Sequence, residues 1–213
     1  MIVYSDKHLN IVMKDTLNIA FVNPPHADWS LANNMTYLMV QSHYNLVGEY
    51  KDRVNWIPAP YKFNKYETIE EIYEEIAEAD VIMYSSYAWN FSIIDELAEY
   101  VKRKSPKTIN VVGGPHIGTN EPDMLEQRKR LYDFICKPTK PGEPFMEDLI
   151  NSYFNNNGVF DIEWISWELR NLQGKQHNIN TDVSVYEEHF DYIKETLDYA
   201  KANKMEPFMI IET

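Results

Sequence analysis

The sequence predicts an α/β fold, an open, doubly wound, five-stranded parallel sheet followed by a C-terminal helical linker. Two observations support this prediction. Short runs of consecutive apolar residues alternate along the chain with longer segments in which apolar residues recur at helical spacing. The short runs are apolar at almost every position, which is typical of strands covered on both faces. Strands that alternate with helices in this way form a parallel sheet with helices on both sides.

Five short apolar runs are expected to be the strands. Most of them end at or just before a proline or glycine, and proline ends a strand because it has no backbone N–H to donate. In chain order the predicted strands are Leu17–Asn23, Val54–Pro58, Asp80–Ser85, Thr108–Gly113 and Tyr132–Cys136.

The segments with helical spacing are expected to be helices. Thr68 and Glu71 have the spacing of a capping box, in which each side chain bonds the backbone N–H of the other residue. Ser92 and Asp95 are expected to open a later helix, and Pro141–Pro144 has the composition of a turn. The predicted helices are Leu31–Tyr44, Thr68–Ala79, Ser92–Ser105, Asp123–Arg130, Phe145–Phe154 and Tyr186–Asn203.

Composition limits the classes of partner. The chain has 213 residues, of which 44% are hydrophobic and 14% aromatic, as expected for a packed core. Its formal charge of −13 repels phosphate backbones and anionic lipids, which argues against nucleic acid and membrane partners. We expect a cytoplasmic chain because it has neither a long apolar run nor a signal-peptide pattern. The single cysteine, Cys136, excludes internal disulfides and a cysteine-rich iron–sulfur site built by this chain alone.

Ligands of open parallel sheets bind at the carboxyl ends of the strands. The loops at this edge do not fit several common ligands. A dinucleotide site needs Gly-x-Gly-x-x-Gly after the first strand, where this chain has Asn23–His26, and the phosphate loop of a flavodoxin-like site is also missing there. A phospho-acceptor receiver domain needs an aspartate where this chain has Ser85.

Three other motifs stand at successive strand ends: Ser85–Asn90 after the third strand, Gly113–His116 after the fourth, and Gly142-Glu143 after the fifth. Together they resemble the N-terminal cobalamin-binding domain of cobalamin-dependent radical S-adenosylmethionine (SAM) proteins, over about Leu17 to Phe154. The resemblance implies a Rossmann-like, flavodoxin-like cobalamin-binding fold. The cofactor-binding residues that it implies are Asn23, His26, Ser85, Tyr87, Trp89, Asn90, Gly113, Gly114, Pro115, His116, Gly142 and Glu143.

Physical roles follow for some of these residues. Gly113 and Gly114 would let the backbone approach the nucleotide tail of cobalamin, and Ser85 could hydrogen-bond a nitrogen or the phosphate of that tail. Tyr87 and Trp89 could pack on the corrin ring, or they could simply pack in the core or an interface. His116 could hydrogen-bond the ligand or cap a turn.

The cobalt ligand of histidine-ligated cobalamin domains is not evident. Such domains carry Asp-x-His-x-x-Gly after the first strand, and that motif is absent here. His26 lies in the corresponding loop at a different spacing, so it is a candidate cobalt ligand or an ordinary loop histidine.

The end of the chain extends the resemblance. In that family a strand like Pro207–Thr213 precedes the three cysteines of the iron–sulfur cluster, and those cysteines are not in this sequence. The iron–sulfur cluster and S-adenosylmethionine would therefore belong to a missing or partner catalytic domain, in cis or in trans. We expect an N-terminal arm (1–15), a cobalamin-binding α/β domain (16–155), and a linker with a long helix and the start of that catalytic domain (156–213).

The expected function is a cobalamin-binding module of a radical SAM-type protein, with methyl transfer or related chemistry in the intact enzyme. We do not expect this chain alone to be catalytic. Two alternatives remain open. One is a regulatory or protein-interaction α/β domain without cobalamin, which Trp164 and Trp167 would suit. The other is an independent enzyme using Glu143 or His116 as acid or base, although no second group is placed to complete a mechanism.

Overall fold

The computed structural model describes residues 14–22, 35–57, 68–118, 128, 130–136 and 142–160. Within these residues strands and helices alternate along the chain. The strands are β1 (Leu17–Val22), β2 (Val54–Ile57), β3 (Val81–Ser85), β4 (Ile109–Gly113) and β5 (Phe134–Ile135). The helices are α1 (Met35–Val47), α2 (Ile69–Ile76), α3 (Phe91–Lys104) and α5 (Gly142–Asn155), with short 3-10 helices η1 (Lys51–Arg53) and η2 (Pro115–Gly118).

The five strands form one sheet in the order β2-β1-β3-β4-β5, and every neighbouring pair is parallel. The prediction of an open five-stranded parallel sheet is confirmed. The order reverses between β1 and β3, which is the point where open α/β sheets leave a crevice for ligands. The predicted helix Tyr186–Asn203 and most of Asp123–Arg130 lie outside the described residues.

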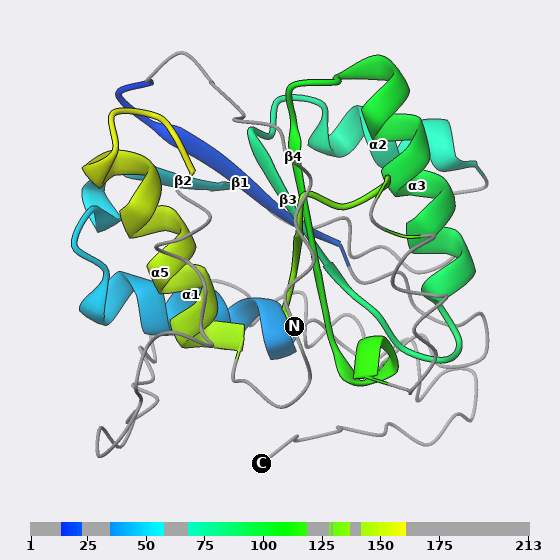
Figure 1. Ribbon diagram of the computed structural model, residues 1–213, viewed down its shortest axis with the longest axis horizontal. Helices are drawn as coiled ribbons and strands as arrows, with labels where there is room; N and C mark the ends of the chain where they lie inside the picture. The colour runs from blue at the N-terminus through cyan, green and yellow to red at the C-terminus, as the bar shows by residue number, and fades with distance from the viewer. Residues whose placement is uncertain are drawn as a thin grey trace, which may run out of the picture.

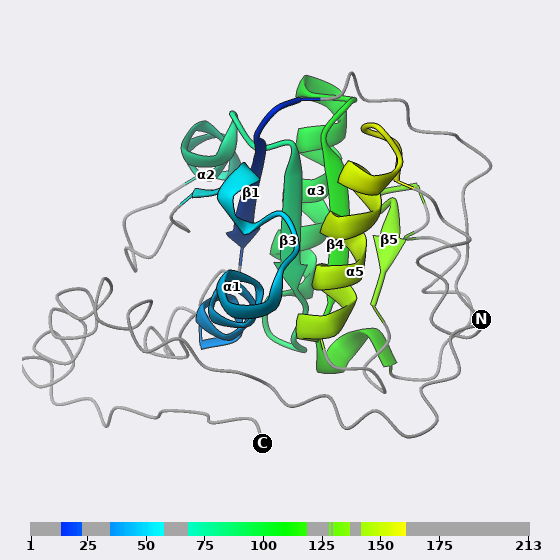
Figure 2. The ribbon, with the colours of Figure 1, turned by 90° about the vertical axis from the view of Figure 1, so that its left-hand side faces the viewer.

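Helices cover both faces of this sheet, because alternate strand residues are apolar on opposite sides. Val81 and Met83 of β3 pack with α1 and α5 in one buried cluster, whereas Ile82 and Tyr84 pack with α2 and α3 in the other. Figure 1 shows α1 and α5 on one side of the strands and α2 and α3 on the other. In Figure 2, α1 and α5 lie in front of the sheet and α3 behind it. The doubly wound arrangement is thereby confirmed.

Helix ends follow the local sequence. The capping box is confirmed, since Glu71 N–H donates to the Thr68 hydroxyl and Thr68 N–H donates to the Glu71 carboxylate, both at 3.3 Å. A tight turn follows α5. Asn157 and Gly158 have φ of 53° and 89°, and Gly158 N–H donates to the Tyr153 carbonyl at 2.8 Å. This bond satisfies one of the last carbonyls of the helix.

Two helix starts differ from the sequence prediction. Pro141–Pro144 was predicted as a turn, yet α5 begins at Gly142 and includes Pro144 in its first turn. Proline is tolerated there because the first turn has no intrahelical partner for its backbone N–H. Helix α3 has Asn90 as its N-cap and begins at Phe91 rather than at Ser92.

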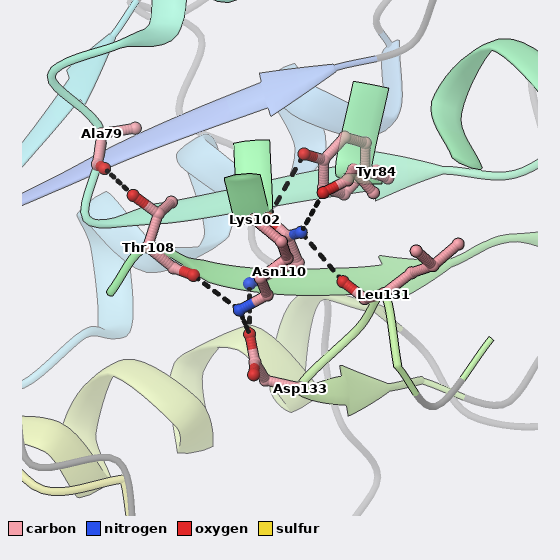
Figure 3. A network of polar contacts seen from close by, with 8 residues as sticks. Ala79, Tyr84, Lys102, Thr108, Asn110, Leu131 and Asp133 are labelled. Atoms are coloured by element: carbon pink, nitrogen blue, oxygen red, sulfur yellow. Dashed lines mark hydrogen bonds and ion pairs between the residues drawn. The ribbon is translucent and has the colours of Figure 1, made fainter. Parts of the chain in front are cut away.

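A buried polar network joins β4 to α3 and to the chain entering β5 (Figure 3). The Asn110 side chain donates to the carbonyls of Ala98 and Leu131 at 3.1 and 2.9 Å, and its backbone N–H donates to the Asp133 carboxylate at 2.8 Å. Lys102 donates to the same carboxylate. The buried polar groups of this network are thus paired, which offsets the cost of burying them and ties the chain entering β5 to β4.

None of the helices in the described ranges is long and apolar enough to cross a bilayer.

Candidate binding site at the carboxyl edge of the sheet

The loops that leave β3 and β4 are bonded to each other at the carboxyl edge. Ser85 pairs with Gly113 at the end of the two strands. The next residue, Ser86, donates its N–H to the Gly113 carbonyl at 2.7 Å, and its own carbonyl accepts from His116 N–H at 3.1 Å. The backbone of Ser86 is therefore held between the start of the β4–η2 loop and the first turn of η2.

Gly114 makes this close contact possible. Its φ is +105°, and a Cβ at this position would lie 2.6 Å from the Ser86 carbonyl oxygen and 2.8 Å from the Ser86 nitrogen. Gly113 is also near its neighbours, because a Cβ there would lie 3.3 Å from the Cys136 Cβ. Gly114 is thus required by contact with the Ser86 backbone, whereas a side chain at Gly113 would be tightly packed. The predicted role of both glycines beside a cofactor tail stays a prediction.

The β3–α3 loop, residues 86–90, is folded around the side chain of Asn90. The Asn90 amide oxygen accepts from Tyr87 N–H at 2.8 Å, and its amide nitrogen donates to the Ser85 carbonyl at 3.0 Å. Asn90 is fully buried. The same residue therefore shapes the loop and begins α3.

The rings of Tyr87 and Trp89 stack on each other in this loop. Their centroids are 4.6 Å apart and their planes differ by 14°. Both residues are half-buried. The pair therefore forms a flat aromatic surface at the carboxyl edge, next to the end of β3.

His116 lies on the α3 side of this edge, against the ring of Phe91. The two ring centroids are 4.6 Å apart, and the Arg128 guanidinium lies 5.3 Å from the same Phe91 ring. Arg128 Nε donates to Asp95 at 3.0 Å, and the Tyr132 hydroxyl donates to the other Asp95 oxygen at 2.7 Å. Burial and the positive charge of Arg128 lower the pKa of His116. A neutral imidazole at pH 7 follows from this shift.

Glu143 and Gly142 begin α5 at the end of the edge next to β5. Glu143 is buried, in the first helical turn, where the helix dipole favours a carboxylate. Burial raises the pKa of the neighbouring Cys136 thiol to about 12, and the charge of Glu143 adds to this rise. A Cβ on Gly142 would meet no atom within 4 Å, so this position borders open space.

Ser86 is a candidate that the sequence prediction missed. It is fully buried, and within the described part of the chain its hydroxyl is one of few buried side-chain groups without a hydrogen-bond partner. A buried hydroxyl in this state is costly unless another molecule pairs with it. Ser85 and Ser86 are adjacent in the sequence, and no feature of the sequence indicates which of the two hydroxyls is buried without a hydrogen-bond partner.

The predicted site residues on β3 and β4 therefore come together, and Gly113 and Cys136 link them to the β5 end. Asn23 and His26 lie outside the described residues, so their predicted roles as cofactor and cobalt ligands stay predictions. Among the residues that the structure describes, there is no group of three or more histidine, cysteine, aspartate and glutamate side chains suited to hold a metal ion.

Part of the chain that includes this edge matches a known family model. Residues 52–143 match the B12 binding domain. The matched range begins in η1 and ends at Glu143, so it contains the β3–α3 loop, the β4–η2 loop and the start of α5. The B12 binding domain match thus supports a cobalamin-binding module. Asn23 and His26 precede the matched range.

Two known proteins are similar to this chain. The cobalamin-dependent radical SAM methyltransferase TokK of Streptomyces tokunonensis is 30% identical over 86 residues, which are 38% of this chain and 13% of TokK. A solved structure of the RcsB response regulator of Salmonella typhimurium superimposes with a TM-score of 0.46 and 14% identity, covering 91% of this chain and 86% of that one.

Proposed function

We propose that this chain binds cobalamin at the carboxyl edge of its sheet, as the cofactor module of a radical SAM-type protein. The observation that carries the proposal is that the B12 binding domain match spans the three segments which the structure brings to this edge. The edge is built from the β3–α3 loop, the β4–η2 loop and the first turn of α5. We further propose that residues 16–155 are the cobalamin-binding unit.

The residues present at the edge fit such a cofactor. Cobalamin combines a broad apolar corrin face with amide side chains and a nucleotide tail. The stacked rings of Tyr87 and Trp89 offer a flat apolar surface for such a face. The buried Ser86 hydroxyl needs a polar partner, and the space beside Gly142 is open. An apolar surface with a few placed polar groups is typical of a cofactor site.

We propose individual roles for these residues. Ser85 and Ser86 hydrogen-bond the polar tail of the cofactor, and the Glu143 carboxylate accepts from its amide groups. His116 offers a neutral imidazole, because burial and Arg128 keep its pKa low. Gly113 and Gly114 keep the two loops in contact, so the surface that they line is fixed before the cofactor binds.

The similarity to TokK supports the radical SAM part of the proposal. In such a protein, bound cobalamin supplies the group-transfer chemistry, typically methyl transfer. The iron–sulfur cluster and S-adenosylmethionine would be bound by a catalytic domain in cis or in trans. The role of this chain is then to hold and orient the corrin.

Cofactor retention tests the proposal directly. Purified protein is mixed with excess hydroxocobalamin, passed through gel filtration, and scanned for the visible bands of the cofactor in the protein peak. We expect co-elution at a ratio near one cofactor per chain, and a heat-unfolded sample of the same protein is the control. Protein that elutes colourless under both reducing and oxidising conditions would overturn the proposal. Dimerisation of that colourless protein would favour the interaction-domain alternative.

A further inference from the structure

Asn90 occupies the N-cap position of α3 without using its side chain as a helix cap. An asparagine at this position ordinarily accepts a hydrogen bond from a backbone N–H of the first helical turn. Here the Asn90 side chain makes no such bond. It turns back into the β3–α3 loop, where it bonds Tyr87 N–H and the Ser85 carbonyl. The loop, rather than the helix, is what this side chain stabilises.

The two bonds fix the peptide groups on either side of Ser86. The β4–η2 loop fixes Ser86 itself, through Gly113 and His116. The chain from Ser85 to Tyr87 is therefore held at three consecutive residues. Further along, Asn90 and Phe91 N–H both donate to the Tyr87 carbonyl, at 3.2 and 3.1 Å. The backbone of the loop that carries Tyr87 and Trp89 is thus held at both ends.

We propose that Asn90 is a positioning residue for cofactor binding, which sets the stacked rings of Tyr87 and Trp89 in place before the cofactor arrives. This inference rests on the proposed function for the identity of the cofactor. Asn90 acts through the loop and not by touching the cofactor, since both ends of its buried amide are bonded to the loop backbone.

The chemistry of the loop requires an amide of this length. Tyr87 N–H needs an acceptor and the Ser85 carbonyl needs a donor, and one asparagine side chain supplies both. Aspartate keeps the acceptor but sets a carboxylate against the Ser85 carbonyl. Serine is an equally good helix N-cap, although its hydroxyl is too short to replace both bonds. Asn90→Ser therefore separates the loop role from the helix role.

The experiment compares Asn90→Ser with Asn55→Ser. Asn55 is an exposed residue of β2 that pairs with Asn18 near the amino ends of the strands, so it is a matched asparagine away from the site. We expect about tenfold weaker binding of hydroxocobalamin for Asn90→Ser, because loss of both bonds loosens the loop. Asn55→Ser should bind as wild type does. Equal affinity of wild type and Asn90→Ser would overturn the inference.

A double-mutant cycle separates positioning from direct contact. Trp89→Ala removes the stack that Asn90 is proposed to hold. If Asn90 acts through the stack, Asn90→Ser should weaken binding much less in the Trp89→Ala background than in wild type. Fully additive losses would show that Asn90 acts on the cofactor independently of the stack, and would overturn the positioning role.

One readout needs no cofactor. Stacked tyrosine and tryptophan rings give a near-ultraviolet circular dichroism signal, and its Trp89 part is the difference between wild type and Trp89→Ala. We expect Asn90→Ser to lose most of this part in the free protein, and Asn55→Ser to keep it. If wild-type protein binds no cobalamin, the proposed function fails. In that case the circular dichroism signal alone tests whether Asn90 positions the rings. An unchanged Trp89 signal in Asn90→Ser would overturn the inference.

Discussion

The backbone of Gly114 lies against the backbone of Ser86 so closely that a Cβ on Gly114 would be 2.6 Å from the Ser86 carbonyl oxygen. This contact joins the two loops of the candidate site. Because the neighbouring atoms belong to backbone, and not to a flexible side chain, they cannot easily move aside.

Gly114→Val should destabilise the free protein. The valine would have to adopt a φ of +105° and push the Ser86 backbone away. Strained backbone of this kind costs about 1–3 kcal/mol, and the clash adds to it. Urea unfolding followed by far-ultraviolet circular dichroism measures the loss. Gly142→Ala, where the new methyl group meets no atom within 4 Å, is the control and should change stability by less than about 0.5 kcal/mol. If Gly114→Val and Gly142→Ala had similar free energies of unfolding, the close contact between Gly114 and Ser86 would be contradicted.

Gly142→Val separates cofactor binding from folding. The side chain enters open space in the free protein, so the unfolding midpoint should stay near that of wild type. If the cofactor occupies that space, hydroxocobalamin should bind about tenfold or more weakly, because a well-packed site loses about 1–3 kcal/mol on overpacking. Equilibrium dialysis measures the affinity. Unchanged affinity would place the cofactor elsewhere than beside Gly142.

Ser86→Ala should weaken cofactor binding without weakening the fold. Its buried hydroxyl has no partner in the free protein, so its removal loses no hydrogen bond. Stability should stay equal or rise, while the bond to the cofactor, worth about 0.5–1.5 kcal/mol, is lost.

Ser152→Ala is the matched control for this change. Ser152 is equally buried, but its hydroxyl donates to the Leu149 carbonyl at 2.8 Å and lies on α5 away from the edge. This variant should lose about 1 kcal/mol of stability and bind cobalamin as wild type does. A stability loss at Ser86 as large as that at Ser152 would mean that the Ser86 hydroxyl has a partner in the protein.

Cys136 should be unreactive in the folded protein. Burial and Glu143 raise its pKa to about 12, so the reactive thiolate is scarce at pH 8. A thiol reagent should label the folded protein slowly and the urea-unfolded protein at once, and the single cysteine makes the assignment unambiguous. Rapid labelling of the native protein would contradict the burial of Cys136.

The same shift has a defined effect on stability. The folded pKa lies above the ordinary value of 9.0, so the protonated thiol is favoured in the folded state. The contribution of Cys136 is therefore complete below about pH 9 and is lost as the pH rises toward 12. Cys136→Ala should flatten the alkaline fall in stability over this range, as measured by urea unfolding at successive pH values.

The sheet and most of its helices could be predicted from the sequence, because buried parallel strands and amphipathic helices leave strong apolar patterns. The capping box at Thr68 could be predicted for a similar reason, since it depends on residues three positions apart. The start of α5 could not be predicted from the sequence. Proline and glycine suit both a turn and a first helical turn, and the choice is made by packing of Phe145 and Met146 beneath the helix.

The details of the site were predictable only in part. The strand-end motifs indicated which loops meet, whereas the assignment of roles within a loop depends on which way each side chain points. Ser85 and Ser86 are adjacent in the sequence, and only the structure shows that the Ser86 hydroxyl is buried without a hydrogen-bond partner. The Asn90 side chain bonds the backbone of the β3–α3 loop instead of capping α3, and no rule of residue spacing predicts this.

The bonds of Ser86 to Gly113 and His116 have a consequence for folding. All of α3 lies between these partners in the chain, so neither loop can take its final form until the β3–α3–β4 crossover has closed. On a ribosome, the edge would assemble only after His116 has been synthesised and has left the exit tunnel. Cofactor capture during synthesis would then require that this crossover is complete.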